Sequence, residues 1–415
     1  MTNDKRLFYG SCFALITTAL SFSIRAGILA QLGTELSFTT TQLGFINSMW
    51  FLGFPLSMLV GGFVYHTVGP KKIMQFAFLS HCAGILLTIF SGNYIGLLIS
   101  TFLIGLGNGC TEAACNPMIA DTYKGVEMSK MMNRFHMWFP GGIVIGALAS
   151  KFMTDHHFSW QTQIWAILIP TLAYAALFFG QTFPESKDVD SRSLSGNLKA
   201  MFSPLFIFMF VCMTLTAVSE FIPQNWVGLI LAHSGAQPML ILALVTGLMA
   251  VARFFGGSIV SKLDQTGVLL GSAILATLGV YLLSTQTGTM AYLSAMVYAC
   301  GIAYFWPNMI GFVAAKIPKS GALGMSVIGA AGMFSTSIWQ PIIGSLIGSN
   351  SAAAAAKGLT GDELALAAGQ ASLKSMAIFP GILIVLFTIL FFWVKNKKAE
   401  PTTSVGAKAQ SVLSH

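Results

Sequence analysis

The sequence predicts an all-α membrane protein whose twelve transmembrane helices form two six-helix pseudo-repeats. Twelve long apolar runs, a polar break near the middle and a one-sided distribution of basic residues support this fold. Of the 415 residues, 55% are hydrophobic and only 9% are charged, whereas soluble domains carry about 25% charged residues. Too few charges remain to cover a surface that faces water.

The predicted spans follow from length, because about 20 apolar residues carry a helix across a bilayer. The first six lie near 7–32, 42–65, 73–91, 94–120, 134–153 and 161–183. The second six lie near 202–231, 238–261, 267–286, 290–315, 322–348 and 374–395. We expect an N-terminal bundle (1–183), a cytoplasmic linker (184–200), a C-terminal bundle (201–398) and a flexible cytoplasmic tail (399–415). Loop 349–373 is expected to hold a flexible link and then a short surface helix.

Basic residues predict the orientation, because loops rich in Lys and Arg stay in the cytoplasm. With the N-terminus inside, the 22 Lys and Arg residues fall on the cytoplasmic side with five exceptions. Lys151, Lys357 and Lys374 lie outside, and Arg25 and Arg253 lie within spans. We expect a multi-pass monomer of the cell (inner) membrane with both termini in the cytoplasm. The net charge of +8 is then a topology signal, and no nucleic-acid partner is expected.

The two halves also echo each other in sequence. Residues 116–119 (Asn-Pro-Met-Ile) in span four resemble 307–310 (Pro-Asn-Met-Ile) in span ten. Residues 61–66 and 256–261, which begin with Gly-Gly, end spans two and eight. A parallel internal repeat of six spans is a known transporter plan.

Three ionisable residues, Arg25, Glu112 and Glu220, lie well inside apolar spans. A charge at that depth costs at least a few kcal/mol, so it usually faces a polar cavity or an ion pathway. This pattern predicts a transporter of a small solute. An enzyme would need a nucleophile–base or metal constellation, and the sequence shows none, so no cofactor or metal is expected. A membrane sensor without transport is the remaining alternative.

Arg25 and Glu220 occupy corresponding places in the two halves, so we expect them to meet or nearly meet across a central cavity. One interpretation is a gated ion pair or a site for substrate and proton. The other is a structural salt bridge, since breaking a buried pair costs several kcal/mol in either case.

Glu112 is the predicted proton-coupling residue, together with Glu220. Desolvation in an apolar span favours the neutral carboxyl, as proton coupling requires. Pro117 frees backbone carbonyls one turn later, and Asn116 offers an amide to a polyol. The alternative is a carboxyl held by Arg134 or by helix packing.

Amides and tryptophans near proline residues suggest a sugar site, because hydroxyls take hydrogen bonds and a sugar's C–H face packs on an aromatic ring. Any single Trp is more often a packing residue, but the set favours a cavity. The predicted substrate-binding residues are Arg25, Asn116, Gln224, Asn225, Trp226, Trp306, Asn308 and Gln340. At the cytoplasmic edge, Arg134 is expected to form a gate bridge with Asp121.

The whole chain resembles the major facilitator superfamily. The family's signature between spans two and three reads here as Gly62, His66, Gly69, Pro70, Lys71 and Lys72. His66 stands in the place of the usual Asp, which implies a weaker or pH-dependent cytoplasmic latch that includes Lys71.

The stretch from Gly109 to Pro117 is similar to span four of the fucose permease and glucose/galactose transporter branch. That resemblance implies a role for Glu112 in proton and sugar binding. In span one, Ala26 stands where the fucose permease has an Asp, and Arg25 is its neighbour. The expected function is therefore proton symport of a sugar by alternating access. The alternative is a carboxylated solute, such as a uronate, bound by Arg25.

Overall fold

The computed structural model describes residues 2–123, 131–132, 134–184, 194–254 and 256–399. Its elements are all helical within these ranges. The helices of the first half are α1 (Asn3–Glu35), α2 (Thr40–Val68), α3 (Pro70–Ser91), α4 (Tyr94–Thr122), α6 (Trp138–Asp155), α7 (Trp160–Trp165) and α8 (Leu168–Phe178). Those that follow are α9 (Leu194–Met201), α10 (Pro204–Asn225), α11 (Val227–Ile230), α12 (Pro238–Phe254), α13 (Gly256–Leu283), α14 (Thr289–Ile302), α15 (Phe305–Lys316), η1 (Pro318–Ser320), α16 (Gly321–Ala356), α17 (Gly361–Met376) and α18 (Ile378–Ala399).

These helices correspond to the predicted spans. Among the described residues, nine helices are long and apolar enough to cross a membrane, and the arrangement is consistent with twelve spans. Four spans are built from two helical pieces each, namely α7 with α8, α10 with α11, α14 with α15 and α17 with α18. Asp264, at φ 58° and ψ 161°, interrupts α13 and separates spans eight and nine.

Local sequence signals set the ends of several helices. Thr39 and Gln42 form a capping box at the start of α2, and the Asn93 side chain caps α4. Both satisfy backbone N–H groups that a helix leaves unpaired at its N-terminus. Pro70 and Pro204 stand at the first positions of α3 and α10, where a missing N–H costs nothing.

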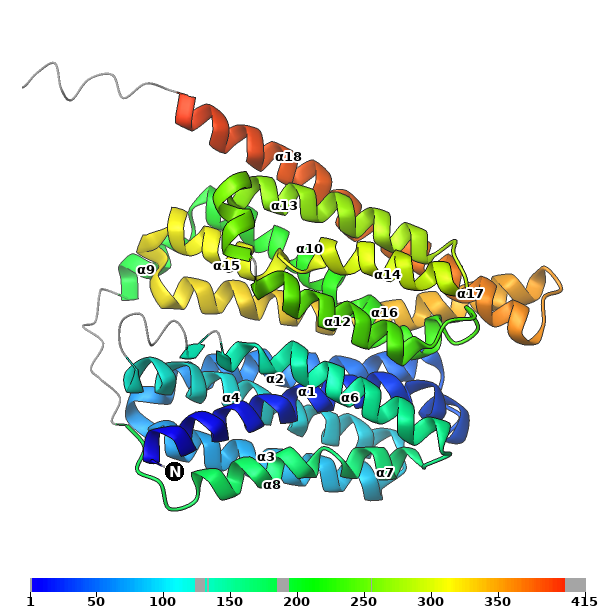
Figure 1. Cartoon of the computed structure of the whole chain (residues 1–415), viewed down its shortest axis with the longest axis horizontal. Helices are drawn as coiled ribbons and strands as arrows, with labels where there is room; N and C mark the ends of the chain where they lie inside the picture. The colour runs from blue at the N-terminus through cyan, green and yellow to red at the C-terminus, as the bar shows by residue number, and fades with distance from the viewer. Residues whose placement is uncertain (1, 124–130, 133, 185–193, 255, 400–415) are drawn as a thin grey trace, which may run out of the picture.

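The helices gather in two bundles, one before and one after segment 184–200 (Figure 1). Part of the predicted linker is itself helical, because α9 begins at Leu194. The N-terminus, α9 and the C-terminal end of α18 lie at one end of the molecule, which we call the terminal end (Figure 1). The hairpin of α16 and α17 protrudes from the other end, which we call the hairpin end.

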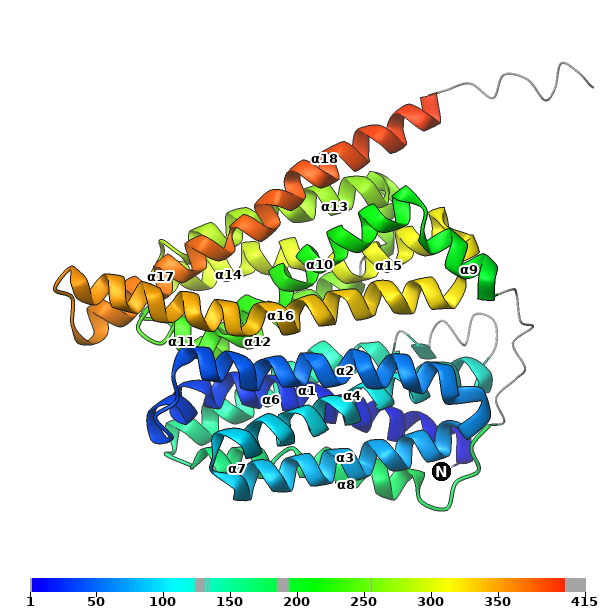
Figure 2. The same cartoon turned by 180° about the vertical axis from the view of Figure 1, so that it is seen from behind.

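The two bundles touch along α2 and α16, which run side by side (Figure 2). A Cβ added at Gly44 would lie 2.5 Å from the carbonyl oxygen of Gln340, and one at Gly344 would lie 2.2 Å from that of Thr40. A Cβ at Gly228 would lie 2.5 Å from the carbonyl oxygen of Ala26. Such small residues allow backbones to approach closely in a membrane, and here they bring the bundles together toward the hairpin end.

The expected flexible link in loop 349–373 is wrong. Helix α16 continues through Ala356, and α17 begins at Gly361. The run from Ala352 to Ala356 consists of the best helix former, so it extends the span instead of ending it. His233 Nδ1 lies 3.0 Å from the Asp362 carboxylate and links the hairpin to the loop before α12.

Candidate functional site

Arg25 of α1 is buried, and the described residues give it no ionic partner. Arg25 is 6% exposed, and its Nε and Nη2 have no hydrogen-bond partner in the described part of the chain. The guanidinium carbon lies 5.2 Å from the centre of the Trp50 ring. A cation–π contact of this kind contributes about 0.5–2 kcal/mol, which is less than the desolvation of a buried ion costs.

An asparagine of α2 lies at the level of Arg25. The indole Nε1 of Trp50 donates to Ser21 Oγ at 2.9 Å, which fixes how α1 and α2 are aligned. Because these helices run in opposite directions, Asn47, one turn before Trp50, comes level with Arg25, one turn after Ser21. Asn47 is fully buried, and both of its amide atoms are unpartnered among the described residues.

A second asparagine approaches from the C-terminal bundle. The rings of Phe22 and Phe221 lie 6.2 Å apart, and Gly228 contacts Ala26. Asn225 lies between these two contacts, at the end of α10, so it also reaches the level of Arg25. It is fully buried, and its two amide atoms likewise lack partners within the described chain.

The fourth polar residue is Gln340 of α16. Its Oε1 accepts a hydrogen bond from Trp226 Nε1 at 2.7 Å, while its Nε2 has no described partner. Ser337, one turn earlier, lies 2.8 Å from Ser48 Oγ of α2. Gln340 therefore lies beside α2, close to the level of Asn47.

We call Arg25, Asn47, Asn225 and Gln340 the interbundle cluster. Its members come from four helices where the bundles meet: α1 contacts α2 and α10, and α16 contacts the same two helices. Buried polar groups are almost always hydrogen-bonded, so four such side chains with unpartnered atoms at one level make this cluster the candidate site for a polar ligand. The sequence predicted Arg25, Asn225 and Gln340 but missed Asn47 and Trp50, which carry no local signal within an apolar span.

An aromatic layer borders the cluster on the side of the terminal end. Phe221 lies at the centre of this layer, 5.8 Å from Phe51 and 6.0 Å from Trp306, measured between ring centres. Phe22 completes the contacts across the two bundles. A solute bound at Arg25 therefore has aromatic surface beside it. Trp306 is half-buried, as a stacking residue would be.

The predicted meeting of Arg25 and Glu220 is wrong for this structure. Glu220 Oε1 accepts from Arg253 Nη2 at 3.0 Å, and Arg253 Nε donates to the Ala303 carbonyl oxygen at 2.9 Å. Arg253 of α12 belongs to the same bundle, so its guanidinium supplies the counter-charge there, while Glu220 Oε2 has no hydrogen-bond partner among the described residues. The sequence places Arg253 within a span, but no sequence pattern links it with Glu220.

Glu112 makes its contact within its own helix. Its Oε2 accepts from Asn116 Nδ2 at 2.6 Å, one turn along α4, and both residues are half-buried. The structure thus brings together these two predicted site residues. Pro117 follows directly inside the helix.

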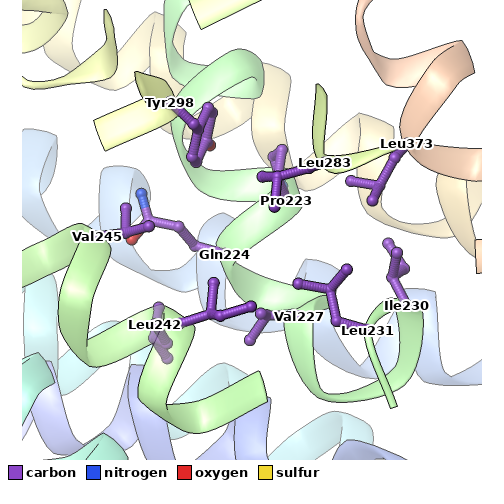
Figure 3. A pocket seen from close by; sticks show the side chains of 11 residues that line it. Pro223, Gln224, Val227, Ile230, Leu231, Leu242, Val245, Leu283, Tyr298 and Leu373 are labelled. Carbon is purple, nitrogen blue, oxygen red and sulfur yellow. The ribbon is translucent and has the colours of Figure 1, made fainter. Parts of the chain in front are cut away.

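Other predicted site residues are already engaged. Gln224 Nε2 donates to the Glu220 carbonyl oxygen at 2.8 Å, and Asn308 Nδ2 donates to that of Tyr304 at 3.0 Å. Gln224 also lines an apolar pocket inside the C-terminal bundle, together with Pro223 and Tyr298 (Figure 3). Trp226 is fully buried, so its ring packs in the core and offers no open face to a solute in this conformation.

The predicted gate residues lie toward the terminal end. Asp121 accepts a hydrogen bond from the Tyr65 hydroxyl at 3.2 Å, and Arg134 is exposed before α6. Lys71 is exposed in the first turn of α3. The side chain of His66 lies outside the described residues. The latch and the Arg134–Asp121 bridge stay predictions.

Comparison with known proteins decides the family. The family model described as Major Facilitator Superfamily matches residues 11–340. The chain belongs to the major facilitator superfamily. A curated relative, the 3-(3-hydroxy-phenyl)propionate transporter of Escherichia coli, is 24% identical over 95% of this chain and 96% of its own length. The hexuronate transporter of Bacillus subtilis is 25% identical over 41% of this chain and 40% of its own length.

Solved structures agree on the fold. A mutant of the nucleoside transporter NupG superimposes with a TM-score of 0.78 at 13% identity, over 94% of this chain and all of that one. A D-xylose-proton symporter gives a TM-score of 0.71 at 14% identity, over 91% and 97% of the two chains. At such identities these likenesses establish the architecture of a superfamily transporter and not its solute.

Proposed function

We propose that this transporter carries an organic carboxylate and that Arg25 binds the carboxylate group. One observation carries the proposal: a buried guanidinium whose Nε and Nη2 have no partner among the described residues. Leaving such a cation without a counter-charge is costly. A carboxylate supplies both the charge and two acceptor oxygens that match the guanidinium fork.

The rest of the interbundle cluster fits the same solute. Asn47, Asn225 and Gln340 offer amide groups to its other polar atoms. Trp50 and the aromatic layer offer apolar surface to its body. The names of two relatives, a transporter of 3-(3-hydroxyphenyl)propionate and one of hexuronates, support a small carboxylated organic solute.

Proton coupling completes the proposal. Glu112 takes the proton, because it is half-buried and is bonded only to a neutral amide in the described structure. Glu220 is the second candidate, but Arg253 already balances its charge. The two bundles alternate access to the cluster, in a cell (inner) membrane with both termini in the cytoplasm.

A neutral sugar is the second candidate, in line with the resemblance to the fucose permease branch. The unpartnered amides of Asn47, Asn225 and Gln340 favour it, since sugar hydroxyls bind such groups. It leaves the charge of Arg25 without compensation, which is why we rank it second.

Counterflow into proteoliposomes separates the candidates. Protein is reconstituted in vesicles loaded with unlabelled solute, and uptake of labelled D-glucuronate, D-glucose and 3-(3-hydroxyphenyl)propionate is measured. D-glucuronate and D-glucose share a ring and differ at one carboxylate. We expect uptake of a carboxylate and none of D-glucose above empty vesicles. Uptake of D-glucose without uptake of either acid would overturn the proposal.

A further inference from the structure

A chain of buried polar side chains crosses the N-terminal bundle and ends at Trp50, whose ring contacts Arg25. The Tyr174 hydroxyl lies 3.0 Å from His81 Nδ1, and His81 Nε2 lies 2.9 Å from Asn108 Oδ1. Asn108 Nδ2 donates to Ser21 Oγ at 3.3 Å, and Trp50 Nε1 donates to the same oxygen at 2.9 Å. Each residue comes from a different helix, and none is more than 2% exposed. We call this chain the Ser21 network.

The direction of every hydrogen bond in the network is fixed. Ser21 donates to the Thr18 carbonyl oxygen at 2.7 Å, so its oxygen accepts from both Trp50 and Asn108. Because Asn108 donates through its nitrogen, its Oδ1 faces His81 and accepts from Nε2–H. His81 Nδ1 is then the acceptor for the Tyr174 hydroxyl. The donors from Tyr174 to Asn108 therefore point from α8 toward α1, and Trp50 of α2 donates to Ser21 from the other end of the network.

The fold makes room for this arrangement. A Cβ at Gly107 would lie 2.4 Å from His81 Cδ2, so only glycine admits the imidazole there. Apolar side chains would also hold these helices together. They would avoid the free-energy cost that a buried polar network carries when any of its groups is left unpaired. The network ends on the indole whose ring faces the Arg25 guanidinium at 5.2 Å.

We propose that the Ser21 network is a positioning device for the solute site: it holds the Trp50 ring in the orientation that places Arg25 for a carboxylate. This inference rests on the proposed function. Ser21 and His81 are then positioning residues, because they touch Trp50 or its partners and not the solute. Loss of the network leaves Arg25 charged but lets Trp50 turn.

A spectroscopic test needs no solute. Protein labelled with 5-fluorotryptophan gives one ¹⁹F resonance per indole, and Trp50→Phe identifies that of Trp50. We expect Ser21→Ala and His81→Leu to shift or broaden this resonance, although His81 does not bond Trp50 directly. His81→Gln keeps a donor toward Asn108, so its Trp50 resonance should lie closer to the wild-type position than that of His81→Leu. Ser23→Ala is the matched control, since Ser23 is also buried on α1 and, in the described structure, donates to the Ala19 carbonyl oxygen within its own helix.

The position of the Trp50 resonance in these variants decides whether the Ser21 network orients Trp50. A Trp50 resonance that keeps its wild-type position in both Ser21→Ala and His81→Leu overturns this inference. If His81→Leu does not fold, Ser21→Ala, which removes one hydroxyl, decides alone. Equal shifts in Ser21→Ala and Ser23→Ala also overturn it, because the effect would then be general loosening of α1.

Transport separates this inference from the proposed function. With whichever of D-glucuronate and 3-(3-hydroxyphenyl)propionate is taken up, Ser21→Ala should raise KM about tenfold with little change in maximal rate, the effect of one lost buried hydrogen bond. If Arg25→Gln abolishes uptake while Ser21→Ala leaves KM unchanged, the positioning role fails and the carboxylate site stands. If the substitutions shift the Trp50 resonance but Arg25→Gln leaves uptake unchanged, the network orients Trp50 and Arg25 does not bind the carboxylate.

Discussion

The internal repeat aligns Arg25 with Glu220, yet the two bundles treat these buried charges differently. Glu220 has a guanidinium partner at 3.0 Å in its own bundle. Arg25 faces an indole ring, and the described residues give its Nε and Nη2 no hydrogen bond. The C-terminal bundle thus neutralises its charge internally, whereas the cation of the N-terminal bundle is the group that we propose binds the ligand. If the proposal holds, the two corresponding positions serve as a structural pair and a binding group.

Replacing Arg25 should give the largest effect. Arg25→Gln is expected to lower carboxylate counterflow by at least about 100-fold, because losing one partner of a buried charge pair costs about 3–5 kcal/mol. Arg25→Lys keeps the charge but loses the planar fork. Its rate of carboxylate counterflow should lie between those of Arg25→Gln and the wild-type protein. Uptake by Arg25→Gln within twofold of wild type would remove the binding role of this residue.

Replacing Glu220 should harm stability more than binding. Glu220→Gln leaves Arg253 without its carboxylate and should lower the free energy of unfolding by about 2–3 kcal/mol. Adding Arg253→Gln should restore part of that loss, since no lone charge remains. Thermal unfolding in detergent measures both effects. Lys151→Gln, which removes an exposed pair with Asp155, is the control and should cost under about 1 kcal/mol. A Glu220→Gln protein as stable as this control would contradict the structural role.

Replacing Glu112 should separate coupling from binding. Glu112→Gln keeps a hydrogen-bonding group beside Asn116 but cannot carry a proton. We expect it to abolish accumulation driven by an imposed pH gradient and to leave solute exchange partly intact. Both are measured in the same proteoliposomes. Wild-type accumulation in this variant would make Glu112 a structural residue and move the proton site elsewhere.

The smallest expected effect concerns Trp226. Trp226→Phe removes the donor to Gln340 Oε1 and should lower stability by about 1 kcal/mol, as for one buried hydrogen bond. Trp160→Phe is a matched control, because Trp160 is equally buried and its indole nitrogen has no described partner. Equal losses in the two variants would show that ring packing, and not the bond to Gln340, holds Trp226 in place.

The fold was predictable because membrane spans reveal themselves by composition alone. Arg25, Glu112 and Glu220 were predictable for the same reason, since a charge is conspicuous in an apolar run. Their partners were not, because the approach of Arg253 to Glu220 depends on how α10 and α12 pack. Asn47 is a small amide in an apolar span, and only the alignment of α1 with α2 brings it level with Arg25. The continuous α16 was not predictable, because the small and polar residues after position 348 are typical of a loop as well as of a helix.

Titration calorimetry of purified protein with 3-(3-hydroxyphenyl)propionate and with its primary amide tests whether Arg25 binds a carboxylate. The two ligands have the same shape and differ in one charge. We expect the acid to bind wild-type protein about 100-fold more tightly than the amide and Arg25→Gln to remove this difference. Equal affinity of the wild-type protein for the acid and the amide would contradict this expectation.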